Sequence, residues 1–191
     1  MAKGDEKKLS KFILSILKDK IEKKFKSISF EERIKVISDL TCIQEKEHAF
    51  HFDLGFSEVD LAIFKKIEFE NKIGFIKSSN TLDGMFKTVM NKKDTKTLNV
   101  PFIIIELKSG DITTDAIRSR RVVAQSIKNI FPFCLYIFIG ENTKKTQETL
   151  RRQGKDFDAY FIYEKKISKK DIIDIYEKFI LQYLEKNLKN D

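Results

Sequence analysis

Residues 99–110, Asn-Val-Pro-Phe-Ile-Ile-Ile-Glu-Leu-Lys-Ser-Gly, are the part of the chain that best indicates its fold. The unbroken apolar run at 102–105 is rich in isoleucine, which is typical of a central strand covered on both faces. Because side chains alternate along a strand, Glu106 and Lys108 share one face and Leu107 lies on the other. Charges at the end of a buried strand cost free energy unless they are paired or bind a metal ion. The stretch therefore predicts either a charge pair emerging into solvent or a functional site.

The composition favours one folded domain, 1–191, with a basic surface. Hydrophobic residues make up 41% of the 191 residues, which is enough for a sizeable core. The 37 basic and 29 acidic residues leave a net charge of +8, which favours polyanionic partners, although lysine-rich surfaces also serve solubility. Cys42 and Cys134 form no metal-binding spacing and are expected to be reduced core thiols. Without a signal-peptide pattern or an apolar run of membrane length, a cytoplasmic protein is expected.

Helical patterns dominate the first part of the chain. Apolar residues recur at helical spacing over 5–27, which predicts an amphipathic helix. Ser29 and Glu32 form a capping-box pattern, which predicts a second helix at about 30–40.

Strand patterns follow. Alternating apolar residues predict a hairpin of two strands, 49–55 and 58–65, with a turn at 55–57. Asp60 lies on the second of these strands. The lysine-rich residues 66–98 are interpreted as an insertion before the central strand.

Helices and strands alternate after the central strand. The patterns predict a helix at 112–130, a strand at 133–139, a helix at 142–153, a strand at 158–163 and a last helix capped by Ser168. The first helix and strand of this series complete a βαβ unit with the central strand, so parallel pairing is expected. Together these elements predict an α/β domain with a mixed sheet of about five strands flanked by helices.

Three charged residues and the order of the elements resemble the PD-(D/E)xK nuclease superfamily, which includes many restriction endonucleases and junction resolvases. The matching residues are Asp60 on an early strand, and Glu106 and Lys108 at the end of the central strand. The resemblance implies a restriction-endonuclease-like core. Val59 stands where the family often has proline, and the 46 positions between Asp60 and Glu106 imply the insertion at 66–98.

The chemistry of phosphodiester hydrolysis explains why these residue types occur together. Asp60 and Glu106 would supply hard oxygen ligands to a divalent cation, and the Leu107 backbone carbonyl could add a third. Such a cation stabilises charge on the phosphate and acidifies a bound water. Lys108 would orient that water or stabilise transition-state charge. The resemblance implies Mg²⁺ as the cofactor, with 5′-phosphate and 3′-hydroxyl products. An acidic-x-Lys triplet is also common by chance, so the alternative interpretation, in which Glu106 and Lys108 form a solvated charge pair at the strand end, is retained.

Further residues are candidates for the same site. Many members of the superfamily carry a glutamate on the first helix, and Glu22 fits that place; the alternative is a solvated charge among lysines. Gln125 lies on the helix after the central strand, where related nucleases often place a Gln or a basic residue. Asp53 and Glu58 are alternative ligands if the strand register differs. Phosphate contacts are predicted for Arg118, Arg121, Lys144 and Lys145.

The predicted function is that of a Mg²⁺-dependent DNA endonuclease of restriction type, with double-stranded DNA as its partner and no membrane association. The chain is little more than a catalytic core, so it resembles the small catalytic subunit of a heterodimeric type IIS restriction endonuclease, which acts beside a recognition subunit. The alternatives are a self-sufficient homodimeric type II restriction enzyme, a Holliday-junction resolvase, and a non-catalytic nucleic-acid-binding protein on the same fold.

Overall fold

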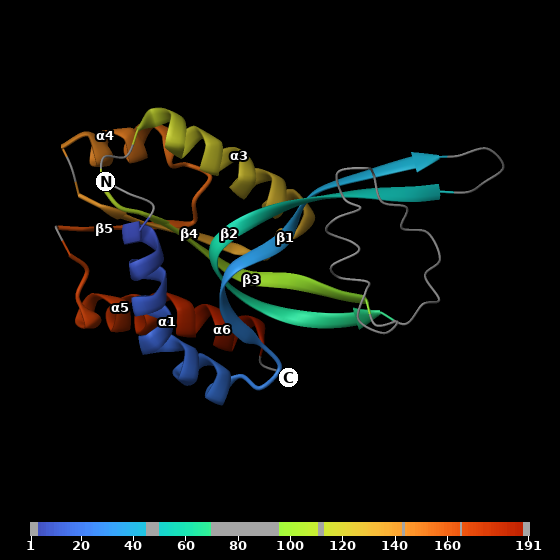
Figure 1. The fold of residues 1–191 in the computed structure, drawn as a ribbon, viewed down its shortest axis with the longest axis horizontal. Coiled ribbons are helices and arrows are strands. Elements are labelled where there is room, and N and C mark those ends of the chain that lie inside the picture. Colours follow the sequence, from blue (N-terminus) through green and yellow to red (C-terminus); the bar gives the residue numbers. More distant parts are fainter. Residues whose placement is uncertain are drawn as a thin grey trace.

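The protein folds around one mixed β-sheet with helices on both faces (Figure 1). The computed structural model describes residues 4–44, 50–69, 96–110, 113–142, 144–164 and 166–188. The strands are β1 (Ser29–Gln44), β2 (Phe50–Phe69), β3 (Lys96–Lys108), β4 (Leu135–Glu141) and β5 (Ala159–Tyr163). The helices are α1 (Gly4–Lys24), α3 (Thr114–Ile130), α4 (Lys144–Gln153), α5 (Lys169–Ile175) and α6 (Leu181–Asn187), and the π-helical segment η2 (Tyr176–Ile180) joins the last two. None of the described helices has the length and apolarity needed to cross a membrane.

Within the described residues, the five strands are arranged in the order β1-β2-β3-β4-β5, which places β3 at the centre. The first three strands pair antiparallel, whereas β3–β4 and β4–β5 pair parallel. The predicted α/β class, a mixed sheet of about five strands flanked by helices, is therefore confirmed.

The central strand is covered on both faces, as its apolar run predicts. Ile103 and Ile105 pack in the cluster that contains α1 and the C-terminal helices, whereas Ile104 packs in the cluster that contains α3. All three side chains are buried. Figure 1 shows the corresponding layers, with α3 and α4 above the sheet and α1, α5 and α6 below it.

The predicted helix at 30–40 is wrong, because these residues belong to β1. The predicted capping box of Ser29 and Glu32 is wrong as well. The Glu32 carboxylate instead accepts a hydrogen bond of 2.6 Å from the Ser10 hydroxyl of α1. The segment is rich in β-branched residues, and it pairs with β2 along nearly its whole length. Such pairing, together with β-branched side chains, favours a strand over a short helix.

The predicted hairpin with a turn at 55–57 is also wrong, because β2 runs through these residues as one strand. Gly55 lies opposite Asp39, directly beside a register shift between Ile37 and Asp39 of β1. A Cβ atom on Gly55 would lie 2.7 Å from the Asp39 Cβ atom. The glycine therefore allows a close approach of two strands at an irregularity, which is a common role of glycine inside a sheet.

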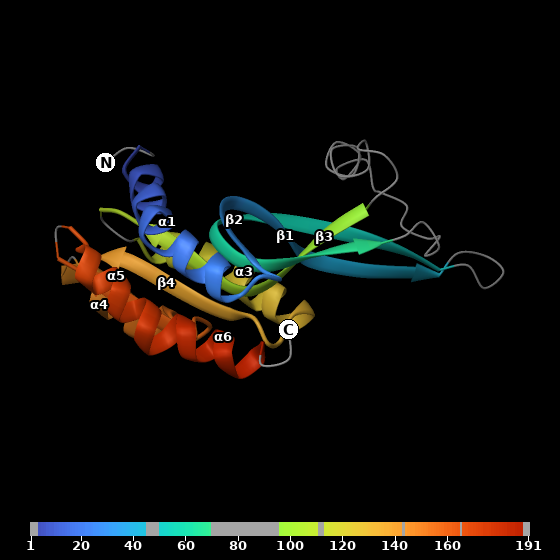
Figure 2. The ribbon, with the colours of Figure 1, turned by 90° about the horizontal axis from the view of Figure 1, so that it is seen from below.

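The β1–β2 ribbon changes its packing partner at Asp60. Leu61 packs in the cluster of α1, whereas Val59 packs in the cluster of α3, although strict alternation would place both on one face. Arg33, which lies between the β1 residues paired with Leu61 and Val59, has a positive φ of 55°. Directly beyond this point the ribbon packs on α3, and its far end projects past the helices (Figure 2).

Both ends of the predicted insertion at 66–98 are strand residues. Lys66 pairs with Asn99, and Phe69 pairs with Lys96, so both ends belong to the β2–β3 ribbon. Residues 70–95 lie outside the described residues.

The C-terminal half follows the predicted order, with small differences at element ends. β4 begins at Leu135, and Phe133, predicted to open this strand, precedes it and is exposed. Ser168 forms the expected N-terminal cap of α5, with a full capping box. The Cys134 thiol is free and buried, as predicted, whereas the Cys42 side chain lies outside the described ones.

Replacement of Gly55 by alanine is expected to destabilise the protein by about 1–3 kcal/mol, because the added methyl group overpacks the contact with Asp39. Urea denaturation of Gly55→Ala and of Glu58→Ala, which introduces alanine at an exposed position of the same strand, measures the difference. Equal unfolding free energies for the two variants would contradict the close approach.

Candidate functional site

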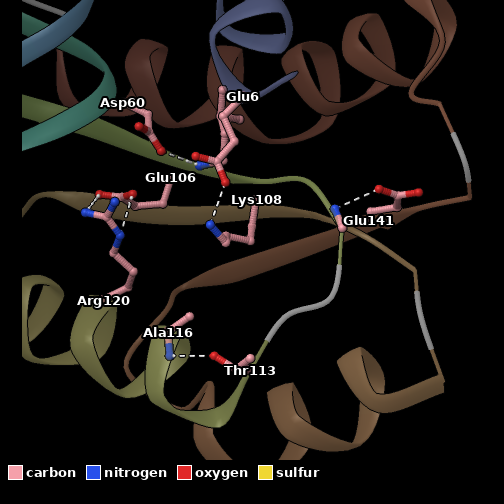
Figure 3. A network of polar contacts seen from close by, with 10 residues as sticks. Glu6, Asp60, Glu106, Lys108, Thr113, Ala116, Arg120 and Glu141 are labelled. Atoms are coloured by element: carbon pink, nitrogen blue, oxygen red, sulfur yellow. Dashed lines mark hydrogen bonds and ion pairs between the residues drawn. The ribbon is translucent and has the colours of Figure 1, made fainter. Parts of the chain in front are cut away.

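Asp60 and Glu106 lie side by side on neighbouring strands. Leu61 pairs with Ile105, so Asp60 and Glu106 are the next residues along β2 and β3. The Asp60 Oδ2 atom accepts a hydrogen bond of 2.9 Å from the backbone N–H of Leu107, which fixes this carboxylate beside the end of β3 (Figure 3). The structure therefore brings together the two carboxylates that the sequence predicts as ligands.

The Glu106 side chain is only 1% exposed, although it carries a carboxyl group. Its Oε1 atom accepts a hydrogen bond of 2.9 Å from the Tyr136 hydroxyl of β4. Arg120 of α3 approaches both oxygens, with Nε 3.2 Å from Oε2 and Nη1 3.5 Å from Oε1. Among the described residues, no group is aligned to donate a hydrogen bond to Oε2. Glu106 is thus a buried carboxyl group whose acceptor capacity is only partly used.

The pKa of Glu106 is raised to about 8, first because burial removes the hydration of the charged form and second because the Asp60 carboxylate lies nearby. Arg120 and the Tyr136 hydroxyl act in the opposite direction, since both stabilise the ionised form. The two carboxyl groups therefore compete for charge, and a cation between them would relieve that competition.

Lys108 lies on the same face of β3 as Glu106, as predicted, while Leu107 packs on the opposite face. The Lys108 Nζ atom lies 2.6 Å from the Oε1 atom of Glu6 in α1. The sequence analysis missed Glu6. It lies three residues before Leu9 and seven before Ile13, and therefore on the helical face that packs on the sheet. A charged residue at the end of a buried stripe was the available signal.

The structure does not place Glu22 among these contacts. Its Oε1 atom accepts a hydrogen bond of 2.9 Å from the backbone N–H of Phe30 and lies 3.7 Å from Lys18 Nζ. Glu22 therefore joins α1 to the start of β1, and Glu6 is the glutamate of α1 that reaches Lys108.

Arg120 replaces Gln125 as the residue of α3 that reaches the site. Gln125 is exposed, whereas Arg120 lies three residues after the buried Ile117 and four before the buried Ala124. Arg120 therefore extends from the core-facing side of α3 to Glu106. Its position within the apolar stripe would have identified it from the sequence.

The predicted phosphate-binding residues differ in their surroundings. Arg118 is exposed and lies 3.9 Å from Asp115 of the same helix. Arg121 is half-buried and pairs with Asp156 at 2.5 Å, so it contributes to the packing of α3. The backbones of the two remaining candidates lie in α4, but their side chains are outside the described ones: Lys144 and Lys145.

A cleft of about 350 Å³ opens beside the buried carboxylate. Its lining comes from the end of β3, from α3 and from β4: Glu106, Leu107, Lys108, Ala116, Ser119, Arg120 and Phe138. Directly after β3, the Gly110 backbone N–H donates a hydrogen bond of 2.8 Å to the Glu141 carboxylate of β4, which holds this turn (Figure 3).

The donor set fits a hard divalent cation in kind. Asp60 and Glu106 offer two neighbouring carboxylates, one of them with a buried oxygen that lacks a hydrogen-bond donor among the described residues, and the Leu107 carbonyl between Glu106 and Lys108 is the predicted third oxygen. No cluster of three or more His, Cys, Asp or Glu side chains suited to a metal ion occurs in the part of the chain that the structure describes. A cation here would therefore depend on the backbone carbonyl and on water for its remaining ligands.

Neither a protein-family model nor a curated protein sequence matches the chain. Its function is therefore inferred from the residues of the site and their geometry.

Replacement of Glu106 by glutamine is expected to change how stability depends on pH. Because the pKa of Glu106 in the folded protein is about 8, above its ordinary value of 4.5, the folded state binds more protons than the unfolded state between these values. In EDTA the wild-type protein should lose unfolding free energy, on the order of a few kcal/mol, as the pH rises from 5 to 8. Glu106→Gln, which resembles the protonated form, should lose much less.

Urea denaturation at pH 5 and pH 8 measures this loss. Glu177→Gln, at an exposed position of η2, is the control and should follow the wild-type protein. The same pH dependence in wild type and Glu106→Gln would contradict a raised pKa of Glu106.

Proposed function

We propose that the protein is a metal-dependent endonuclease that hydrolyses phosphodiester bonds in double-stranded DNA. The single observation that carries this proposal is the convergence of Asp60, Glu106 and Lys108 where the middle of β2 lies beside the end of β3, next to a cleft. These are the residues on which the resemblance to PD-(D/E)xK nucleases depends. The mixed sheet flanked by helices also agrees with that family's core.

In this proposal, Asp60, Glu106 and the Leu107 carbonyl hold Mg²⁺. When bound, such an ion supplies positive charge at the phosphate and lowers the pKa of a water ligand. Tyr136 fixes the Glu106 carboxylate through its hydroxyl, a supporting contact of the kind that orients metal ligands.

Lys108 is the proposed catalytic cation of the chain itself. The Lys108 side chain is 35% exposed and lines the cleft, and its ammonium group pairs with Glu6. Positioned in this way, it donates hydrogen bonds to the attacking water or to the phosphate oxygen that gains charge in the transition state. Glu6 restricts the ammonium group to the side of the cleft that adjoins α1.

DNA recognition is proposed to depend on a partner. The net charge of +8 supplies attraction to the DNA backbone that is independent of sequence. Specific recognition typically buries about 1,000–2,500 Å² and reads base edges in a groove. The described residues contain no element beyond the sheet and its covering helices that would do this. A recognition subunit, or a second copy of the chain, would supply the missing surface.

Asp60→Asn is expected to abolish cleavage of a supercoiled plasmid in Mg²⁺, because it removes one of two carboxylate ligands. Lys108→Met should lower the rate by about 10²–10³, as expected for a lost electrostatic stabiliser. The matched controls are Asp19→Asn and Lys35→Met, both at exposed positions, and they should cleave like wild type. Full activity of Asp60→Asn would contradict the site.

The purified protein alone is expected to nick long DNA slowly or without sequence preference. Mapping of the DNA ends, with and without proteins encoded by neighbouring genes, tests this dependence on a partner. Discrete double-strand cuts at one short sequence by the protein alone would favour a homodimeric restriction enzyme, and preferred cleavage of four-way junctions would favour a resolvase. DNA binding without any metal-dependent cleavage would favour a non-catalytic binding protein.

A further inference from the structure

Arg120 occupies the cleft side of the buried Glu106 carboxylate. Its Nε and Nη1 atoms lie 3.2 and 3.5 Å from the two carboxylate oxygens, and it projects from α3 towards β3 (Figure 3). The Arg120 side chain is 39% exposed, whereas Glu106 is 1% exposed, and both line the same cleft. A cation that enters through this cleft therefore approaches Glu106 where a guanidinium group already neutralises it.

The contact between the two groups is an incomplete one. Arg120 Nε lies within ion-pair distance of Glu106 Oε2 but is not aligned to donate a hydrogen bond to it. A guanidinium group can give a carboxylate two parallel hydrogen bonds, and such bidentate pairs are the strong ones. In this geometry Arg120 compensates the charge of Glu106 without forming a bidentate hydrogen-bonded pair. The Oε2 atom of Glu106 therefore remains available to another cation.

We infer that Arg120 is an exchangeable counter-cation, which neutralises Glu106 in the metal-free protein and leaves it when a divalent cation binds between Asp60 and Glu106. This inference rests on the cation site of the proposed function. Arg120 then sets the affinity of the site for cations without being a ligand. The exposure of its side chain leaves it free to move into the cleft, whereas Tyr136 stays in place and continues to orient Glu106.

The charge of the ion determines the direction of the effect. A fixed positive charge repels a divalent cation twice as strongly as it repels a proton at the same place. Removal of Arg120 relieves repulsion of both a proton and a divalent cation at Glu106. The relief is larger for the divalent cation, so cation binding gains more than protonation. Loss of Arg120 should therefore tighten cation binding, whereas loss of a residue that merely shapes the site would weaken it.

The test is calorimetric titration of Mn²⁺ into DNA-free protein at pH 7.5 and pH 9, which controls for proton competition at Glu106. Arg120→Gln is expected to bind about tenfold more tightly than wild type, a coupling of ordinary size between two sites. Arg120→Lys, which keeps the charge, should bind with nearly wild-type affinity. Arg118→Gln is the matched control on the same helix and should be unchanged, because Arg118 pairs with Asp115 away from the carboxylates.

A second measurement needs no variant. The ¹⁵Nε resonance of Arg120 in the wild-type protein should shift when Mg²⁺ is added, because the guanidinium group loses its contact with Glu106, while the Arg121 resonance, held by Asp156, should not. An unmoved Arg120 resonance at saturating Mg²⁺ would overturn the exchange.

The outcomes separate this inference from the proposed function. Cation binding that Asp60→Asn abolishes but that Arg120→Gln leaves unchanged or weakens would overturn the exchange and leave the cation site standing. No cation binding to wild type or to any variant would overturn both.

Discussion

The burial of the Glu106 carboxyl group at the end of the central strand is the constraint around which the site is arranged. β3 is apolar on both faces up to Ile105, and the next side chain carries a charge with almost no access to water. Each neighbouring element contributes one polar group to it: Asp60 from β2, Arg120 from α3 and Tyr136 from β4. Arg120 and Tyr136 compensate the burial only in part, and Asp60 adds to it, so the pKa of Glu106 is about 8.

The elements that the sequence predicts correctly are those whose patterns are unambiguous over their own length. The run of isoleucines in β3 and the apolar stripe of α3 each have one interpretation. Residues 30–40 do not, because their apolar residues fit both a helix and a strand, and long-range pairing with β2 decides between them. Gly55 misleads for a similar reason, since its role depends on the approach of Asp39 from another strand.

The residues of the site likewise divide into those that a local pattern predicts and those that depend on contacts between distant elements. The pairing of Glu106 with Lys108 on one face follows from alternation within β3, and Asp60 was identified through its resemblance to a known motif. Glu6 and Arg120 were missed because their roles arise from the packing of helices on the sheet. Both nevertheless lie on the core-facing stripes of their helices, where a charged residue needs a partner.

The strand order of the sheet has a consequence for how the chain assembles. Each described strand pairs with the described strands next to it along the chain, so the sheet follows the order of the sequence. Asp60, Glu106, Arg120 and Tyr136 belong to consecutive described elements, so the contacts among them involve neither terminal helix. Lys108, by contrast, meets Glu6 across 102 positions, and it acquires its partner only when α1 docks. The position of the lysine thus depends on α1, whereas the acidic part of the site does not.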